Sequence, residues 1–497
     1  MEHLLASFVL LLQPIPLLLL FIGVASGIVI GSIPGLTATM LITLTLPLTF
    51  FMDSVNAITM LVGMYVGGIS GGLIAATLLR MPGTPASIMT TFDGYPLSQK
   101  GHSARALGLG ITASFIGGLI SWMFLAVLSP PLAQLALTFG PWEYFTLVLM
   151  ALVMLASLSQ GSMIKALMAA ALGMMVHLPG VDPSLGQMRL TFDIHNLEGG
   201  LSLLPVLIGA FAVSQIFKDI VVIDREPPPV KLERKGMLLS LADMKKYSGN
   251  FFRSSCIGTW VGLLPGIGAN IAAMLSYTTA KNVSKEPEKF GTGHEHGIVA
   301  AETANNAAVG GALIPLITMG IPGSVVDAIL IGALIMHNLE PGPLLFTTNP
   351  EIAYGVITAY LIGNIIMFGI MMFSVVHIAR MLYIPRAYLL ATILLFCIIG
   401  VFAVANRFFD VWIMLIFGVI GFIMERTKMP LGPFVIGFVL SPIAEMQLRS
   451  GLMATDGSLL PLFTRPFAAT FFAISVLSLF WPLFIEWRNK NRNQTAA

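Results

Sequence analysis

The chain has 497 residues, of which 56% are hydrophobic and 10% are charged, and its mean hydropathy is +0.88. A soluble domain contains about 25% charged residues, so this composition predicts an all-α polytopic membrane protein. The formal net charge of +2 provides no basic face that could neutralise phosphates, which argues against nucleic acid as a partner.

About fifteen apolar segments follow one another along the chain. A full membrane crossing needs roughly 20 residues, so the shorter segments leave open whether they cross the bilayer or re-enter it. The segments lie near residues 14–34, 36–52, 56–79, 103–129, 141–159, 161–178, 201–221, 250–266, 268–281, 297–320, 351–379, 388–408, 410–425, 431–450 and 462–486.

Two Pro-Gly breaks in the first half of the chain recur in the second half. GSIPGLTATM contains Pro34 and GLLPGIGANI contains Pro265, an offset of 231 residues; MPGTPAS contains Pro82 and MGIPGS contains Pro322, an offset of 240. Each break frees backbone N–H and C=O groups that hydrocarbon cannot satisfy. Interrupted helices at matching places in two halves indicate the binding site of a secondary transporter.

We predict that these breaks and the polar, uncharged residues beside them bind a carboxylate substrate. A helix that restarts after a break presents free N–H groups and the positive end of its dipole, which attracts anions without a buried Lys or Arg. The alternative, that the hydroxyl groups only cap helices, stays open. The predicted substrate-binding residues are Pro34, Gly35, Thr37, Thr39, Gly83, Thr84, Ser87, Pro265, Gly266, Gly268, Asn270, Gly323 and Ser324.

Glycines at a spacing of four residues precede the first break in each half. Gly23, Gly27 and Gly31 share one helix face, as do Gly258 and Gly262. Such stripes let helix backbones approach closely, so we predict that they serve packing and not binding.

Glu302, Asn305 and Asn306 form an unusual polar cluster in the apolar stretch AAETANNAAVGG. They lie within about one helical turn, and ionisable groups at membrane depth are usually functional. We predict that they bind the coupling ion, Na⁺ or H⁺; the alternative is a structural glutamate at the cytoplasmic interface. No other metal or cofactor is expected, because His294-Glu295-His296 looks like a solvated loop without further ligands.

The basic residues are distributed unevenly. If the loop Arg225 to Lys246 is cytoplasmic and the segments alternate, all 26 Lys and Arg fall inside except Arg189, Arg407, Arg449 and Arg465. This asymmetry follows the positive-inside rule and predicts a cytoplasmic C-terminus and a periplasmic N-terminus. Seven segments precede the loop, and an odd number inverts the second repeat relative to the first.

The predicted organisation has four parts. Residues 1–222 form the first inverted repeat, 223–249 a cytoplasmic linker, 250–458 the second inverted repeat, and 459–497 an additional C-terminal transmembrane helix with a cytoplasmic tail. A short interfacial helix is expected from Met237 to Tyr247 within the linker.

One catalytic pattern needs weighing. Gly68 to Gly71 reads GISG, a GxSG of the type used by intramembrane serine proteases. Such an enzyme pairs the serine with a membrane histidine, and only His177 and His377 stand near segment ends. In a chain with 49 glycines this pattern is weak, so the protein is not expected to be an enzyme.

At these residues the chain resembles the large membrane subunit of the tripartite tricarboxylate transporters. The resemblance rests on PGLTATM at Pro34, on PGIGANIAAM at Pro265, and on the blocks Met81 to Gly101 and Glu302 to Ser324. It covers nearly the whole chain. Two positions depart from the family pattern: Ala301, where Pro is frequent, and Asn270, where an acid is common.

The resemblance implies a bacterial inner-membrane importer of tricarboxylates or related organic carboxylates, driven by an ion gradient. It also implies two partners, a small four-helix membrane subunit and a periplasmic solute-binding protein that delivers substrate. By analogy with other inverted-repeat carriers it suggests an elevator-type secondary transporter, in which a domain that holds the broken helices slides against a scaffold. The alternative is a standalone secondary carrier or exporter of another organic anion.

Overall fold

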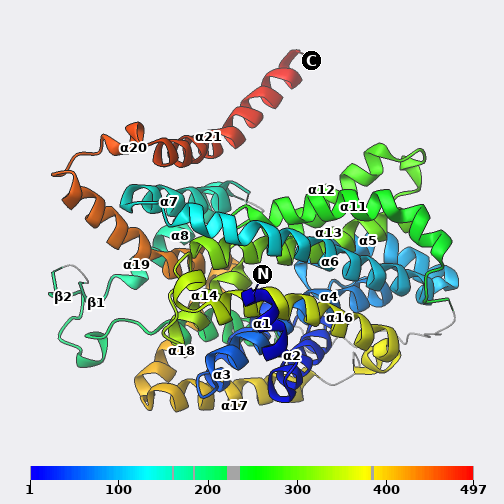
Figure 1. The fold of residues 1–497 in the computed structure, drawn as a ribbon, viewed down its shortest axis with the longest axis horizontal. Coiled ribbons are helices and arrows are strands. Elements are labelled where there is room, and N and C mark those ends of the chain that lie inside the picture. The colour runs from blue at the N-terminus through cyan, green and yellow to red at the C-terminus, as the bar shows by residue number, and fades with distance from the viewer. Residues whose placement is uncertain (1, 159–161, 183–184, 221–235, 382–385, 496–497) are drawn as a thin grey trace.

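Nearly the whole chain folds into α-helices (Figure 1). The computed structural model describes residues 2–158, 162–182, 185–220, 236–381 and 386–495. Strands β1 (Gly180–Val181) and β2 (Met188–Arg189) form a small antiparallel hairpin. The prediction of an all-α polytopic chain is therefore confirmed.

The helices of the first half are α1 (Glu2–Leu11), α2 (Pro14–Ser32), α3 (Ala38–Thr49), α4 (Ser54–Leu79), α5 (Ile88–Leu97), α6 (Ser103–Ala136), α7 (Pro141–Leu158), α8 (Met163–His177), α9 (Leu203–Leu207) and α10 (Ser214–Ile220). Those of the second half are α11 (Leu241–Leu263), α12 (Gly268–Val283), α13 (Glu295–Met319), α14 (Val325–Met336), α15 (Leu345–Thr348), α16 (Pro350–Met381), α17 (Arg386–Ala405), α18 (Phe408–Arg426), α19 (Leu431–Ala454), α20 (Pro461–Thr464) and α21 (Pro466–Thr495). Short 3₁₀ or π turns are η1 (Pro85–Ser87), η2 (Ser98–His102), η3 (His195–Leu197), η4 (Ile208–Val213) and η5 (Pro287–Lys289).

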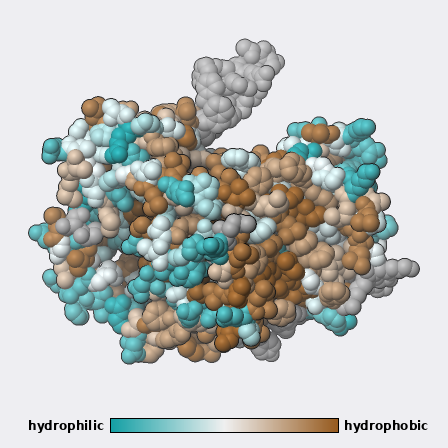
Figure 2. All heavy atoms as spheres, viewed as in Figure 1, coloured by the Kyte–Doolittle hydropathy of each residue, from teal (hydrophilic) through white to brown (hydrophobic). Residues whose placement is uncertain are grey.

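Not every expected segment is a full membrane crossing. Within the described ranges, 8 helical stretches are long and apolar enough to cross a membrane, and six shorter apolar helices accompany them. The expected segments 36–52 and 161–178 correspond to the short helices α3 and α8. Figure 2 shows apolar residues gathered over the middle of one face and hydrophilic residues mostly toward its edges.

The connector between the halves differs from the expectation. Residues 221–235 lie outside the described part of the chain. The expected interfacial helix from Met237 to Tyr247 does not form as a separate element, because Leu241 begins the long helix α11. Ser240 caps this helix by accepting a hydrogen bond from the Asp243 N–H at 3.1 Å, which fixes its start.

Two helices lie at the centre of the fold, one in each half. All of the most apolar window of α4 is buried, and residues 297–318 of α13 are buried without interruption. α4 packs mainly against α2 and α16, and α13 mainly against α6 and α11. A helix that is buried all round belongs to a protein core, so neither of these two faces lipid along its length.

The glycine stripes pack as predicted, and they do so equivalently in the two halves. A Cβ atom at Gly31 would overlap the carbonyl oxygen of Gly68, and one at Gly262 would overlap that of Ala308. The first residues of these pairs are 231 apart and the second are 240 apart, the same offsets as the breaks. Close backbone contact at both places explains why a larger residue is disfavoured.

The four predicted helix interruptions are present. Helix α2 ends at Ser32, α4 at Leu79, α11 at Leu263 and α13 at Met319. In each case a new helical segment starts a few residues later. Left-handed backbone is needed in both halves: φ is 96° at Gly35 and 76° at Gly266. Glycine adopts this conformation without steric cost, which is why the breaks contain it.

Candidate functional site

The segments that restart after the four breaks converge on one cavity. Its volume is roughly 360 Å³, in the range of small-molecule sites. The beginnings of α3, η1, α12 and α14 all contribute to its lining. Elements from the two halves of the chain thus line a single cavity, although their residues are at least 180 positions apart.

The structure places the predicted substrate-binding residues in two groups. Seven line the cavity: Thr37, Thr39, Thr84, Gly266, Gly268, Asn270 and Ser324. Six do not line it and instead shape the breaks behind it: Pro34, Gly35, Gly83, Ser87, Pro265 and Gly323. The interpretation of the second group as direct ligands finds no support in this geometry.

The glycines of the second group lie where a side chain would meet the protein and not the cavity. A Cβ at Gly35 would lie 3.2 Å from both carboxylate oxygens of Asp219. A Cβ at Gly323 would lie 2.7 Å from the carbonyl oxygen of Gly262. These glycines permit close packing of the interrupted segments, so their contribution to the site is indirect.

Two of the lining hydroxyls cap helices, as the alternative interpretation required. Thr37 accepts a hydrogen bond from the Met40 N–H at 3.2 Å at the start of α3. Ser324 accepts one from the Asp327 N–H at 3.4 Å at the start of α14. Thr84 differs, because its buried hydroxyl has no hydrogen-bond partner among the described residues. Capping accounts for Thr37 and Ser324 and leaves the Thr84 hydroxyl available.

The sequence interpretation did not name Tyr65, which lines the cavity, or Asp327, which contacts the cavity-lining Tyr65 and Ser324. The Tyr65 hydroxyl of α4 lines the cavity and lies 3.0 Å from the Ser324 hydroxyl. It also donates a hydrogen bond to Asp327 Oδ2 at 3.5 Å, and Asp327 is completely buried. The signal for Asp327 was its position, because an ionisable residue in an apolar run one turn after a break is unusual.

The remaining wall of the cavity comes from elements outside the repeat motifs. Leu155 and Leu158 of α7 and the stretch 430–433 before and within α19 contribute apolar surface. No Lys, Arg or His is among the described residues that line the cavity. Only backbone N–H groups and helix dipoles at the restarting segments could therefore favour an anion there.

Glu302, Asn305 and Asn306 form a cluster that does not line the cavity. All three are buried in α13. The Glu302 carboxylate accepts hydrogen bonds from Thr90 of α5, from Ser114 of α6 at 3.2 Å, and from Asn305 Nδ2 at 3.5 Å. The Glu302 side chain is therefore held inside the protein by side chains from three helices.

The cluster continues toward the first half of the chain. Asn306 Oδ1 accepts a hydrogen bond from the Ser70 hydroxyl of α4 at 2.6 Å, beside the cavity-lining Ile69. Asn305 Oδ1 has no partner within the described ranges. The hydroxyl of Ser70, the serine of the GxSG pattern, donates to Asn306 and to the Val66 carbonyl, and no described histidine bonds to it.

Comparisons with known proteins agree with the geometry. The model of the tripartite tricarboxylate transporter TctA family matches residues 17–436. An uncharacterised 52.8 kDa protein from the TAR-I ttuC' 3' region of Agrobacterium vitis is 34% identical over 480 residues, covering 96% of this chain and 95% of the relative. An uncharacterised protein from the TAR-II region of the same organism is 34% identical over 233 residues, which is 47% of this chain and 96% of that relative. No solved structure matches.

Proposed function

Because this chain belongs to the tripartite tricarboxylate transporter TctA family, we propose that it is the large permease subunit of a binding-protein-dependent importer. It carries tricarboxylates or related organic carboxylates across the bacterial inner membrane and is driven by an ion gradient. A periplasmic solute-binding protein delivers the substrate, and a small four-helix membrane subunit completes the complex.

The convergence of the interrupted segments on one cavity carries this proposal. Backbone N–H groups at helix starts bind carboxylates, and the seven predicted residues that line the cavity bring Thr, Ser and Asn side chains to the same place. A site made from fixed dipoles binds an anion more weakly than a buried cation would. This suits a carrier, since the substrate must leave on the other side.

The equivalent packing of the two halves supports an inverted-repeat carrier of the elevator type. The contacts Gly31 with Gly68 and Gly262 with Ala308 relate α2 and α4 to α11 and α13. Residues 1–222 and 250–458 are the two repeats, connected by the linker 223–249. In this proposal the body that contains the breaks moves, and α7 and α19 provide the opposing wall.

We assign ion coupling to Glu302, Asn305 and Asn306. The cluster combines a carboxylate, amide oxygens and the hydroxyls of Thr90 and Ser114, which are the donor types that Na⁺ accepts and that a proton relay uses. Asn305 Oδ1, which has no hydrogen-bond partner among the described residues, supplies a further acceptor. Hydrogen bonding through Asn306 and Ser70 links the cluster to α4 and so to the substrate cavity.

Thr39→Val tests the substrate site. This change keeps the side-chain shape and removes a hydroxyl that lines the cavity. Losing one hydrogen bond to a carboxylate weakens binding by about tenfold or more, because such bonds contribute about 1.5–3 kcal/mol. We expect the KM for citrate uptake by proteoliposomes that contain all the subunits to rise by that factor.

Thr43→Val is the matched control. Thr43 lies one turn further along α3, is fully buried, and donates to the Thr39 carbonyl at 2.7 Å outside the cavity. Its replacement should leave the KM unchanged. An unchanged KM in Thr39→Val, or the same rise of the KM in both variants, would show that the substrate does not bind in the cavity.

The proposed orientation predicts which faces react with an impermeant thiol reagent. In a variant without Cys256 and Cys397, a cysteine at Leu238 should react only from the cytoplasm and one at Thr347 only from the periplasm. Both positions are exposed, and Leu238 does not carry the capping role of Ser240. Labelling of both from the periplasm in intact cells would contradict the inverted-repeat proposal.

The four basic residues assigned to the periplasm are all paired with carboxylates. Arg189 and Arg449 pair with Asp182 and Glu445, Arg407 pairs with Asp410, and Arg465 pairs with Glu143. These pairs carry no information on orientation, because the positive-inside rule counts basic residues and acidic residues contribute little to it.

A further inference from the structure

A second hollow, separate from the substrate cavity, lies where the start of α11 meets the end of α12 and the start of α13. Its volume is roughly 710 Å³, and we call it the basic pocket. Lys246, Arg253, Lys285 and Lys289 are among its lining residues, against the carboxylates Glu286 and Glu295. Positive charge therefore exceeds negative charge in the pocket before the histidines are considered.

Both carboxylates of the pocket already have cationic partners. Glu286 accepts a hydrogen bond from Lys289 Nζ at 2.7 Å, and this ammonium holds the pKa of Glu286 below its usual range. Glu295 pairs with Arg105 Nε at 2.8 Å and with Lys246 Nζ at 3.3 Å. It also accepts a hydrogen bond from the Tyr247 hydroxyl.

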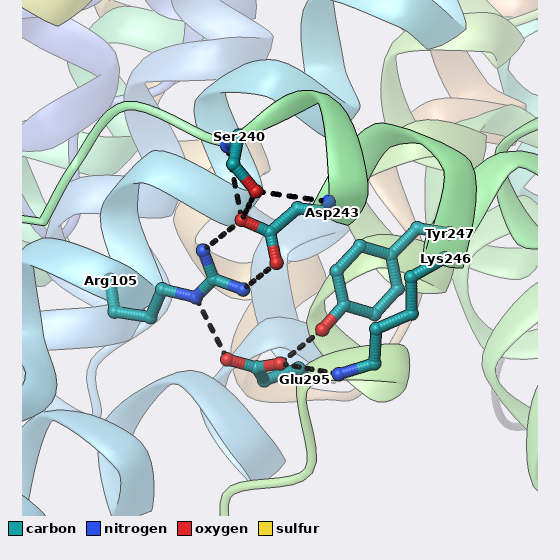
Figure 3. Close-up of polar contacts among 6 residues, drawn as sticks. All are labelled: Arg105, Ser240, Asp243, Lys246, Tyr247 and Glu295. Atoms are coloured by element: carbon teal, nitrogen blue, oxygen red, sulfur yellow. Dashed lines mark hydrogen bonds and ion pairs between the residues drawn. The ribbon is translucent and has the colours of Figure 1, made fainter.

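Figure 3 shows how the Glu295 contacts continue into a balanced network. Arg105 reaches across to Asp243 with two hydrogen bonds of 2.9 and 2.7 Å, while its Nε holds Glu295. Two cations, Arg105 and Lys246, thus face two carboxylates, Asp243 and Glu295. The network fixes one wall of the pocket. Its two carboxylates are balanced by its own two cations, so they do not neutralise the other basic residues of the pocket.

Arg253 and Lys285 are the cations that remain. Among the residues that the structure describes, neither forms an ion pair with a carboxylate. Arg253 Nη2 donates to Asn250 Oδ1 at 2.6 Å, but its buried Nε has no partner in that part of the chain. A partly buried guanidinium with unused donors is costly unless an anion satisfies it.

The backbone around the pocket is held in place. Asp93 Oδ1 of α5 accepts hydrogen bonds from the N–H groups of Gly291, Gly293 and His294 at 2.8–2.9 Å. Asp93 Oδ2 accepts one from the Tyr277 hydroxyl at 2.8 Å. The loop that carries the far wall is therefore fixed before any ligand binds, which lowers the entropic cost of binding.

An exposed apolar surface adjoins the pocket. On α11, Cys256 and Trp260 follow Arg253 on the same helix face, and Phe252 next to it is 63% exposed. Trp260 is 58% exposed and lies about 10 Å further along the helix axis. Val283 at the end of α12 is 66% exposed. A cationic pocket above an exposed apolar stripe matches an amphiphile with an anionic head.

We propose that the basic pocket binds the phosphate headgroup of an anionic phospholipid. The phosphate bridges Arg253 and Lys285, and the acyl chains lie along the α11 stripe that contains Trp260. The lipid thereby connects α11 to the α12–α13 loop from the membrane side. The orientation given under Proposed function places this lipid in the cytoplasmic leaflet. The existence of the lipid site does not depend on that orientation.

The experiment measures lipid binding to the purified chain by native mass spectrometry and by the thermal shift in detergent. Phosphatidylglycerol should bind and raise the Tm, and phosphatidylcholine should not. Arg253→Gln and Lys285→Gln should each weaken phosphatidylglycerol binding by roughly fivefold, the effect of one cation near an anionic membrane surface. Lys281→Gln is the matched control, since Lys281 is exposed at the end of α12 outside the pocket.

Several results would overturn the proposal. Equal binding of phosphatidylcholine would show that the protein does not recognise the headgroup charge. Lys285 lies in an exposed loop, so its replacement should not disturb folding. Unchanged phosphatidylglycerol binding in Lys285→Gln would therefore show that the lipid does not bind in this pocket. Inorganic phosphate that matches the effect of phosphatidylglycerol at equal concentration would identify a free anion as the ligand. Because none of these measurements involves transport, their failure is distinguishable from failure of the proposed function.

Discussion

Glu302→Gln is expected to reduce gradient-driven accumulation of substrate strongly. The change keeps the shape of a buried side chain that bonds to Thr90, Ser114 and Asn305, and it removes the charge. Coupling requires that the ion bind the conformational states of the carrier with different affinity, and typical coupling factors are about 5–150-fold. The accumulation ratio in reconstituted vesicles should fall by a factor in that range.

Downhill exchange of preloaded substrate serves as the internal control, because it needs the cavity and not the ion. Exchange should persist in Glu302→Gln if the variant is folded. In a sodium-coupled carrier, Asn305→Ala should raise the sodium concentration for half-maximal uptake, because it removes an Oδ1 that no described residue bonds. Normal ion dependence in both variants would make the cluster purely structural.

Gly268→Leu is expected to abolish uptake while the protein remains folded. Gly268 begins α12 and lines the cavity, and a Cβ placed on it would lie 3.9 Å from the Ser324 Cβ, its nearest neighbour. A leucine side chain would therefore project into open space and fill the site. Gly35 and Gly266 are less suitable probes, because their Cβ atoms would meet Asp219 and Leu155.

The backbone conformation of Gly268 needs a separate control. Its φ of +71° is unfavourable for leucine, so part of the effect could arise from strain. Gly101 has a φ of +88°, and no atom lies within 4 Å of a Cβ placed on it. Gly101→Leu should cost similar backbone strain and retain uptake. Normal uptake by Gly268→Leu would show that the substrate does not occupy this cavity.

The four breaks were predictable because their cause is local. Proline lacks a backbone donor and glycine accepts left-handed backbone, so the adjacent pairs Pro34-Gly35 and Pro265-Gly266 favour an interruption. Pro47 and Pro315, which have no glycine beside them, lie inside continuous helices. The glycine stripes were predictable for a similar reason. A spacing of four residues puts Gly27 and Gly31 on one face of their helix, and Gly258 and Gly262 on one face of theirs, where another backbone can approach closely.

Individual ligand positions were less predictable. The sequence placed Gly35 and Gly323 in the site, whereas their Cβ positions face Asp219 and Gly262. Tyr65 was missed because an aromatic residue in an apolar run has no distinctive pattern, although it bonds to Ser324 from the other half of the chain. The contact spans 259 residues, and no local rule gives the rotation of α4 that creates it.

The sequence by itself determined the membrane class, the interruption of four helices and the recurrence of the Pro-Gly breaks in the second half, because composition and backbone geometry act over a few residues. The tertiary structure alone decided that seven of the thirteen predicted ligands line one cavity, that α7 and residues 430–433 complete it, and that Glu302 is buried away from it. The physical reason is that the direction of a side chain depends on how its helix rotates and packs against distant elements, and this is fixed only when the whole core is assembled.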